Sequence, residues 1–176
     1  MFDSLRNDLV RGPEQRPELY VSDVGGGGLH PLLYTRADEW SSVVEVHSAS
    51  GRLLSTRTAF GAPLGVAVTG RYVAVLTEAA HTNAKQFEIS DARTGNLLRT
   101  VPIGWSGATG PLYGEAGRVV YRAGRALMLL DLRSGVRRRL AVPRGRIAGF
   151  ALAGNRLYWA ENGAHGGRVR SLSIPR

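Results

Sequence analysis

The stretch FEISDARTGNLLRT, residues 87–100, joins two apolar runs through a turn in which Asp91 precedes Thr94-Gly95. An Asp at that spacing accepts hydrogen bonds from the backbone N–H groups of the turn, and the glycine takes the left-handed conformation that closes it. Similar phrases occur at residues 44–57, VEVHSASGRLLSTR, and 127–140, LMLLDLRSGVRRRL. The chain therefore repeats one strand–turn–strand design, which indicates internal repeats.

A second phrase alternates with the first along the chain. It reads GVAVTGRYVAVLTE at 65–78, GPLYGEAGRVVYRAG at 110–124 and GFALAGNRLYWAENG at 149–163. In each copy a glycine-containing pair separates two apolar runs, which predicts a tight β-hairpin. These pairs are Gly70-Arg71, Gly117-Arg118 and Gly154-Asn155. Two hairpins in each repeat give four short strands, here named A to D.

The two phrases together predict fifteen strands in four units, 18–58, 64–103, 111–142 and 147–174. The expected strands are 18–24, 31–36, 42–48 and 52–58; 64–69, 71–78, 85–91 and 96–103; 111–115, 117–122, 125–132 and 136–142; and 147–153, 155–161 and 167–174. The last unit has no strand D. The N-terminal segment, residues 1–17, contains SLRNDLVRGP, which resembles the D strand NLLRTVPIGW. We expect this segment to close the last unit as an outer strand.

The D-x-x-[ST]-G phrase after an apolar strand resembles the repeats of β-propeller proteins. LMLLDLRSGVRRRL is similar to TolB-like repeats, and FEISDARTGNLLRT is similar to quinoprotein-type repeats. The resemblance covers about residues 18–174 and implies an all-β propeller of about four four-stranded antiparallel blades. Such a chain forms either a small closed ring or part of a larger propeller.

Quinoprotein-type blades usually carry a Trp four residues after the turn glycine. This chain has Ser55, Arg99 and Arg139 at those positions. The resemblance therefore does not extend to a quinone, and we expect no cofactor.

The composition excludes several classes of site and leaves the compartment undetermined. The 176 residues include no cysteine, so disulfides and thiolate metal sites are excluded. No apolar run is long enough to cross a membrane, and the N-terminal sequence MFDSLRNDLVRG does not read as a secretory signal.

The net charge of +9 is unevenly distributed along the chain. Residues 1–91 hold 8 Lys and Arg against 11 Asp and Glu, a net −3, whereas residues 92–176 hold 15 against 3, a net +12. Arginine in place of lysine is typical of a GC-rich genome. The charge follows no helical stripe and no aromatic pattern, so we do not expect a nucleic-acid partner.

The propeller resemblance implies that the D–A and B–C loops share one face, the usual binding face. Polar and aromatic residues of these loops are our candidate ligand-binding residues: Asp38, Glu39, Trp40, Glu78, His81, Trp105, Glu161 and His165. Trp side chains stack on flat ligands, and a Glu/His pair can move a proton or hold a metal. The alternative is that these residues cap turns or face water. Their spacing defines no metal site.

No catalytic motif is present in the sequence, so our first hypothesis is a non-enzymatic binding or scaffold protein that recognises a protein or a small ligand. The second is a hydrolase or lyase that uses Glu78 with His81 and Glu161 with His165. A homo-oligomer that completes the propeller is a further expectation.

Residues 133–146, RSGVRRRLAVPRGR, carry six arginines and no acid. Charge on an outermost strand discourages sheets from joining edge to edge, which is a structural explanation for these residues. The functional alternative is a polyanion-binding patch formed by Arg133, Arg137, Arg138, Arg139, Arg144 and Arg146.

Overall fold

The computed structural model describes residues 19–21, 29–35, 41–79, 82–104, 107–164 and 166–175. These residues form fifteen strands and no helix. The strands are β1 (Leu19–Val21), β2 (His30–Thr35), β3 (Ser41–His47), β4 (Leu53–Phe60), β5 (Ala62–Thr69), β6 (Tyr72–Glu78), β7 (Lys85–Asp91), β8 (Leu97–Gly104), β9 (Ala108–Glu115), β10 (Arg118–Ala123), β11 (Ala126–Asp131), β12 (Arg137–Ala141), β13 (Arg146–Ala153), β14 (Arg156–Gly163) and β15 (Gly166–Ser173).

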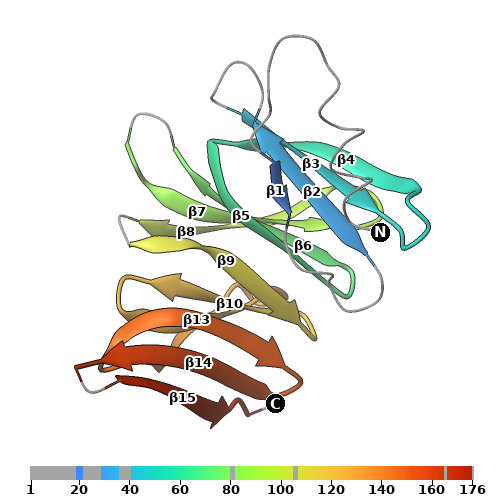
Figure 1. Ribbon diagram of the computed structural model, residues 1–176. Helices are drawn as coiled ribbons and strands as arrows, with labels where there is room; N and C mark the ends of the chain where they lie inside the picture. The colour runs from blue at the N-terminus through green and yellow to red at the C-terminus, as the bar shows by residue number, and fades with distance from the viewer. Residues whose placement is uncertain are drawn as a thin grey trace.

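The strands form four antiparallel sheets in chain order: β1–β4, β5–β8, β9–β12 and β13–β15. Within each sheet every strand pairs with its sequence neighbour. Figure 1 shows the sheets stacked in the same order, with the first and the last at opposite ends. The predicted all-β architecture is confirmed, and each expected strand overlaps an observed one. Residues 1–17 lie outside the described residues, so the closing strand stays a prediction.

In the second and fourth sheets the A–B hairpin turns lie where the sequence predicts, whereas in the third sheet the turn is shifted by one residue. Gly70 and Gly154 have φ of 58° and 57° and open the expected two-residue turns. In the third sheet Glu115 pairs with Arg118, so the turn is Ala116–Gly117 rather than Gly117-Arg118. Both residues of that turn have positive φ, 50° and 74°. Gly117 therefore occupies the second turn position, as in a type I′ turn.

The Asp-containing turns form as the sequence predicts. The Oδ1 atom of Asp91 accepts hydrogen bonds from the backbone N–H groups of Arg93 at 3.0 Å and Thr94 at 3.2 Å. Asp131 Oδ1 accepts from both the backbone N–H and the hydroxyl of Ser134, each at 2.7 Å. These bonds, led by the Arg93 and Ser134 N–H groups, lower the pKa of both carboxyls.

Apolar cores fill the spaces between successive sheets. Alternate residues of β6 pack on opposite faces of the second sheet. Val73 and Val75 belong to the core shared with the first sheet, and Ala74 and Leu76 belong to the core shared with the third. A third core joins the third and fourth sheets: Val120, Leu127, Leu129, Phe150, Leu157, Trp159 and Ile174. Each inner sheet is therefore buried on both faces.

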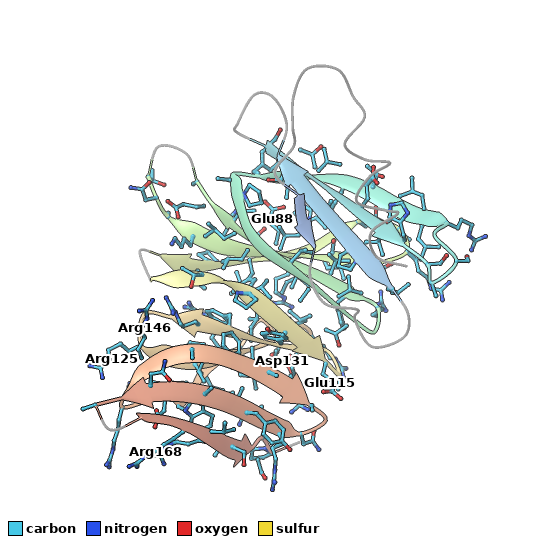
Figure 2. The ribbon with its side chains drawn as sticks, viewed as in Figure 1. Glu88, Glu115, Arg125, Asp131, Arg146 and Arg168 are labelled. Atoms are coloured by element: carbon cyan, nitrogen blue, oxygen red, sulfur yellow. The ribbon has the colours of Figure 1, made fainter. Side chains whose placement is uncertain are left out.

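A buried carboxylate links the first two sheets. Glu88 of β7 is 2% exposed and forms an ion pair with Arg57 of β4. Its other oxygen accepts a hydrogen bond from the backbone N–H of Phe60 at 3.0 Å. Glu88 is labelled in Figure 2, where it lies between the two sheets. Glu88 therefore connects β7 of the second sheet to β4 of the first, and removing one partner of the pair would leave a buried charge without compensation.

The substitution Glu88→Ala should lower the free energy of unfolding by about 3 kcal/mol, because it leaves the Arg57 guanidinium buried without its partner. The control is Glu78→Ala, which removes a partly exposed pair with Lys85 and should cost less than about 1 kcal/mol. Urea denaturation of both variants measures the difference. Equal losses would contradict the assigned role of Glu88.

The double variant Asp91→Ala/Asp131→Ala tests whether the two carboxylates stabilise their turns, because that stabilisation depends on pH. Both carboxyls have a pKa below the ordinary value of 3.8. The free energy of unfolding that these carboxylates add is therefore fully present above pH 3.8, and it is lost as the pH falls through their pKa values in the folded chain. At pH 7 we expect the double variant to lose about 2 kcal/mol of stability. Chemical denaturation at decreasing pH should show this gap narrowing below pH 4, and a gap independent of pH would contradict the explanation.

Candidate functional site

The B–C turn of the third sheet, between β10 and β11, contacts the described parts of the D–A loops on either side of it at one edge of the stacked sheets. Gly124, in the β10–β11 turn, donates its N–H to the carbonyl of Gly107 in the β8–β9 loop at 3.0 Å. In the next pair of loops, Arg125 Nη2 donates to the carbonyl of Arg144 at 3.1 Å. Figure 2 shows Arg125 and Arg146 on this edge and Glu115 near the opposite one. We call this edge the loop face.

An arginine-rich cleft opens on the loop face where the third and fourth sheets meet. Its volume is about 430 Å³, and four of its lining residues are arginines. The lining residues come from the end of β10, the β10–β11 turn, the β12–β13 loop and the start of β13: Arg122, Gly124, Arg125, Arg144, Gly145, Arg146 and Ile147. No carboxylate is among them. We call this site the arginine cleft.

Arg122 has an unusual environment within the arginine cleft. Its Nε atom is buried and has no hydrogen-bond partner in the described part of the chain. A buried N–H group without an acceptor costs free energy, and the cost is larger for a charged group. Arg122 therefore retains hydrogen-bonding capacity that the described residues leave unused.

The β12–β13 loop is fixed by close contacts with the fourth sheet. Glu161 of β14 accepts hydrogen bonds from the Arg144 backbone N–H at 3.1 Å and from Arg170 Nε at 2.6 Å. The Arg170 bond is the main reason that the pKa of Glu161 lies below its ordinary value. A Cβ atom added to Gly145 would lie 2.3 Å from the carbonyl oxygen of Asn162, so only glycine fits there.

A smaller cavity of about 180 Å³ adjoins the arginine cleft and shares Arg144 and Gly145 with it. It is lined in addition by Arg168 and Arg170 of β15. The carboxylate in this cavity, Glu161, is only 6% exposed and already pairs with Arg170. Positive charge therefore continues from the arginine cleft onto the last sheet.

Two of the predicted ligand-binding residues lie in the described part of the chain, and they are in different sheets. Glu78 ends β6 and pairs with Lys85 at 3.1 Å, whereas Glu161 belongs to β14. The other six lie outside the described residues, and their roles stay predictions: Asp38, Glu39, Trp40, His81, Trp105 and His165. Among the described residues, no group of three or more His, Asp and Glu side chains is placed to hold a metal.

The structure distributes the six predicted arginines over three places. Arg133 lies in the β11–β12 turn, where its carbonyl accepts a hydrogen bond from Arg99 Nη2 at 3.2 Å. Arg137, Arg138 and Arg139 are exposed on β12, the outermost strand of its sheet. Arg144 and Arg146 line the arginine cleft. The six arginines are exposed and extend from the β11–β12 turn along β12 to the arginine cleft, and their binding of a polyanion stays a prediction.

Sequence reasoning missed Arg122 and Arg125. They flank the tight turn of RAGR, residues 122–125, and are not among the candidate residues of the loops. The available signal was their position: a B–C turn places both arginines at the loop face, beside the arginines of the following D–A loop.

Comparisons with known proteins identify the fold. No protein-family model matches the chain, and no curated protein matches its sequence. An ACO/RPE65 chimera aligns with a TM-score of 0.58 and 11% identity over 94% of this chain and 50% of its own. HIRA residues 644–1017 align with a TM-score of 0.59 and 13% identity, over 85% of this chain and 49% of the HIRA chain. A chain of a nidogen/laminin complex aligns with a TM-score of 0.52 and 15% identity, over 94% of this chain and 62% of its own length.

These structures are β-propeller proteins, so the chain has the β-propeller fold. It spans about half the length of the first two of them. The described residues contain no helix of the length and apolarity that crossing a membrane requires.

The substitution Gly145→Ala should displace the β12–β13 loop, because the new methyl group would overlap the Asn162 carbonyl. We expect a loss of about 2 kcal/mol in unfolding free energy. Gly149→Ala is the matched control in β13, since a Cβ there meets nothing within 4 Å. Thermal unfolding of both variants distinguishes them. Similar melting temperatures for the two would show that the loop is not held as described.

Proposed function

We propose that the chain is a non-enzymatic β-propeller binding protein whose loop face recognises a small ligand with an oxyanion group, such as a phosphate or sulfate. The observation that carries this proposal is the arginine cleft: four arginines line it without a carboxylate, and Arg122 Nε is buried there without an acceptor. The volume of about 430 Å³ is typical of small-molecule sites.

The chemistry of the guanidinium group favours this ligand class. Arginine presents planar pairs of N–H donors that match the oxygens of phosphate, sulfate or carboxylate. Four such groups lining one cleft repel each other, and an anion relieves that repulsion. Arg122 is half-buried, and charge-assisted hydrogen bonds to a partly buried guanidinium are stronger than those on an open surface.

The alternative of a hydrolase or lyase rests on Glu78 with His81 and Glu161 with His165. Glu161 is committed to Arg170 and to the Arg144 backbone, and its lowered pKa keeps it ionised at neutral pH. Glu78 is paired with Lys85. Both carboxylates are therefore held by cationic partners, and we infer that binding is the better supported function.

A second candidate function is polyanion binding, and a different set of arginines supports it. Arg137, Arg138 and Arg139 are consecutive and exposed on β12, away from the cleft lining. Neighbouring residues of a strand point to opposite faces, so these side chains present charge on both sides of the outer strand. This arrangement fits an extended polyanion, whose retention would fall with added salt.

The double variant Arg122→Gln/Arg146→Gln tests the arginine cleft. With inorganic pyrophosphate as the probe, calorimetric titration of the wild-type chain should show saturable binding. Loss of two charge-assisted contacts should weaken that binding about a hundredfold, since each contributes about 1.5 kcal/mol or more. Arg137→Gln/Arg139→Gln on β12 is the matched control and should leave the affinity within about twofold.

Two results would overturn the assignment. The first is a wild-type chain that binds neither pyrophosphate nor sulfate. The second is an affinity that falls only in the β12 control variant, which would move the anion site to the outer strand and support polyanion binding instead.

A further inference from the structure

Exposed apolar side chains recur at one end of the outermost strands of the first three sheets. Leu53 begins β4 and Leu97 begins β8, and each lies beside a β-bulge at the same place in its strand. Their side chains are 50% and 52% exposed, and Leu98, the bulged residue of β8, is 46% exposed. Val136, in the turn just before β12, is 63% exposed. Each of these sheets therefore presents an apolar side chain to solvent at the start of its outermost strand.

Contacts between the sheets bring these positions to one continuous edge. Ser55 Oγ in β4 donates a hydrogen bond to the carbonyl of Ala92 at 2.8 Å, so the β7–β8 turn lies against β4. Arg99 Nη2 in β8 donates to the carbonyl of Arg133 at 3.2 Å, so the β11–β12 turn lies against β8. We call this edge the outer rim; it includes Leu53, Arg93, Leu97, Leu98, Arg99, Arg133 and Val136.

The charged side chains of the outer rim are basic. Arg93 and Arg133 occupy equivalent positions in the two turns, and both are exposed, as is Arg99. The carboxylates of these turns, Asp91 and Asp131, accept hydrogen bonds from their own turn residues. The outer rim therefore combines apolar side chains with guanidinium groups open to solvent, which is complementary to a partner that is both anionic and apolar.

We propose that the outer rim binds the surface of an anionic lipid bilayer. Acidic headgroups attract the guanidinium groups, and the leucine and valine side chains enter the boundary between headgroups and acyl chains. The apolar side chains come from three different sheets, and a bilayer accepts several separate side chains at once. A bound peptide would instead need a groove or a free strand edge to hold its residues.

This site is separate from the proposed ligand site. The outer rim is formed by the C–D turns and the starts of the D strands, whereas the arginine cleft lies among the B–C and D–A loops. Because each strand pairs antiparallel with its neighbour, these two groups of connections lie at opposite edges of the sheets. Membrane contact through the outer rim would leave the arginine cleft open to its ligand.

The test is co-sedimentation of the chain with two kinds of vesicle. One kind contains phosphatidylcholine alone, and the other contains phosphatidylcholine and phosphatidylglycerol in equal parts. The wild-type chain should bind the mixed vesicles and not the neutral ones. Added salt should reduce that binding, because it screens the attraction between arginines and headgroups.

The apolar contribution is tested with Leu53→Gln/Val136→Gln. This variant should bind the mixed vesicles about tenfold more weakly or worse, because two apolar side chains no longer leave water. The matched control is Phe60→Gln/Val142→Gln at the other ends of the same two strands. Those side chains are 72% and 53% exposed, and their replacement should leave vesicle binding unchanged.

The charge contribution is tested with Arg93→Gln/Arg133→Gln. The substitution keeps the backbone of both turns and should weaken binding to the mixed vesicles about tenfold or more. Arg125→Gln/Arg146→Gln on the loop face removes the same net charge from the opposite edge and should bind the mixed vesicles nearly as the wild type does.

Four results would count against the proposal. A wild-type chain that binds neither kind of vesicle would exclude membrane contact. Equal binding by Leu53→Gln/Val136→Gln and its control would show that no apolar side chain of the outer rim enters the bilayer. Equal losses in the two arginine variants would show that net charge, rather than the outer rim, attracts the vesicles. Retention on immobilised polyglutamate without vesicle binding would assign the outer rim to an acidic protein segment instead.

Discussion

The structure depends on face-to-face packing of short antiparallel sheets. A strand places alternate residues on opposite faces, so an inner strand such as β6 contributes to two cores at once. No sheet of this size buries enough apolar surface by itself, and each is stabilised by its neighbours. The Glu88–Arg57 pair adds a polar contact to one of these junctions. The ends of the stack consequently differ from its middle.

The arginine cleft is a product of the same packing. Arg122 and Arg125 belong to the third sheet and its turn, and Arg146 begins the fourth. None of these residues is near Glu161 in sequence, yet Glu161 fixes the loop between Arg144 and Arg146. The charge of the cleft therefore requires correct stacking of two sheets, and its shape requires a glycine at position 145.

Much of the architecture could be predicted from the sequence because its signals are local. Alternating apolar residues, Asp91 and Asp131 in their turns, and the glycines that follow them act within a few residues. The one error in hairpin position, at Ala116–Gly117, arose because a glycine can take either place in a two-residue turn. The arginine cleft and the Arg57–Glu88 pair could not be predicted, because their residues meet only when sheets stack. Six candidate ligand-binding residues lie outside the described part of the chain and stay predictions.

The lining of the arginine cleft comes from both the third sheet and the start of the fourth, so the cleft exists only while these two sheets are packed together. A ligand that contacts both sheets binds the packed state and not the separated one, and it would therefore stabilise the packing by mass action. Ligand binding at this place would raise the melting temperature of the chain.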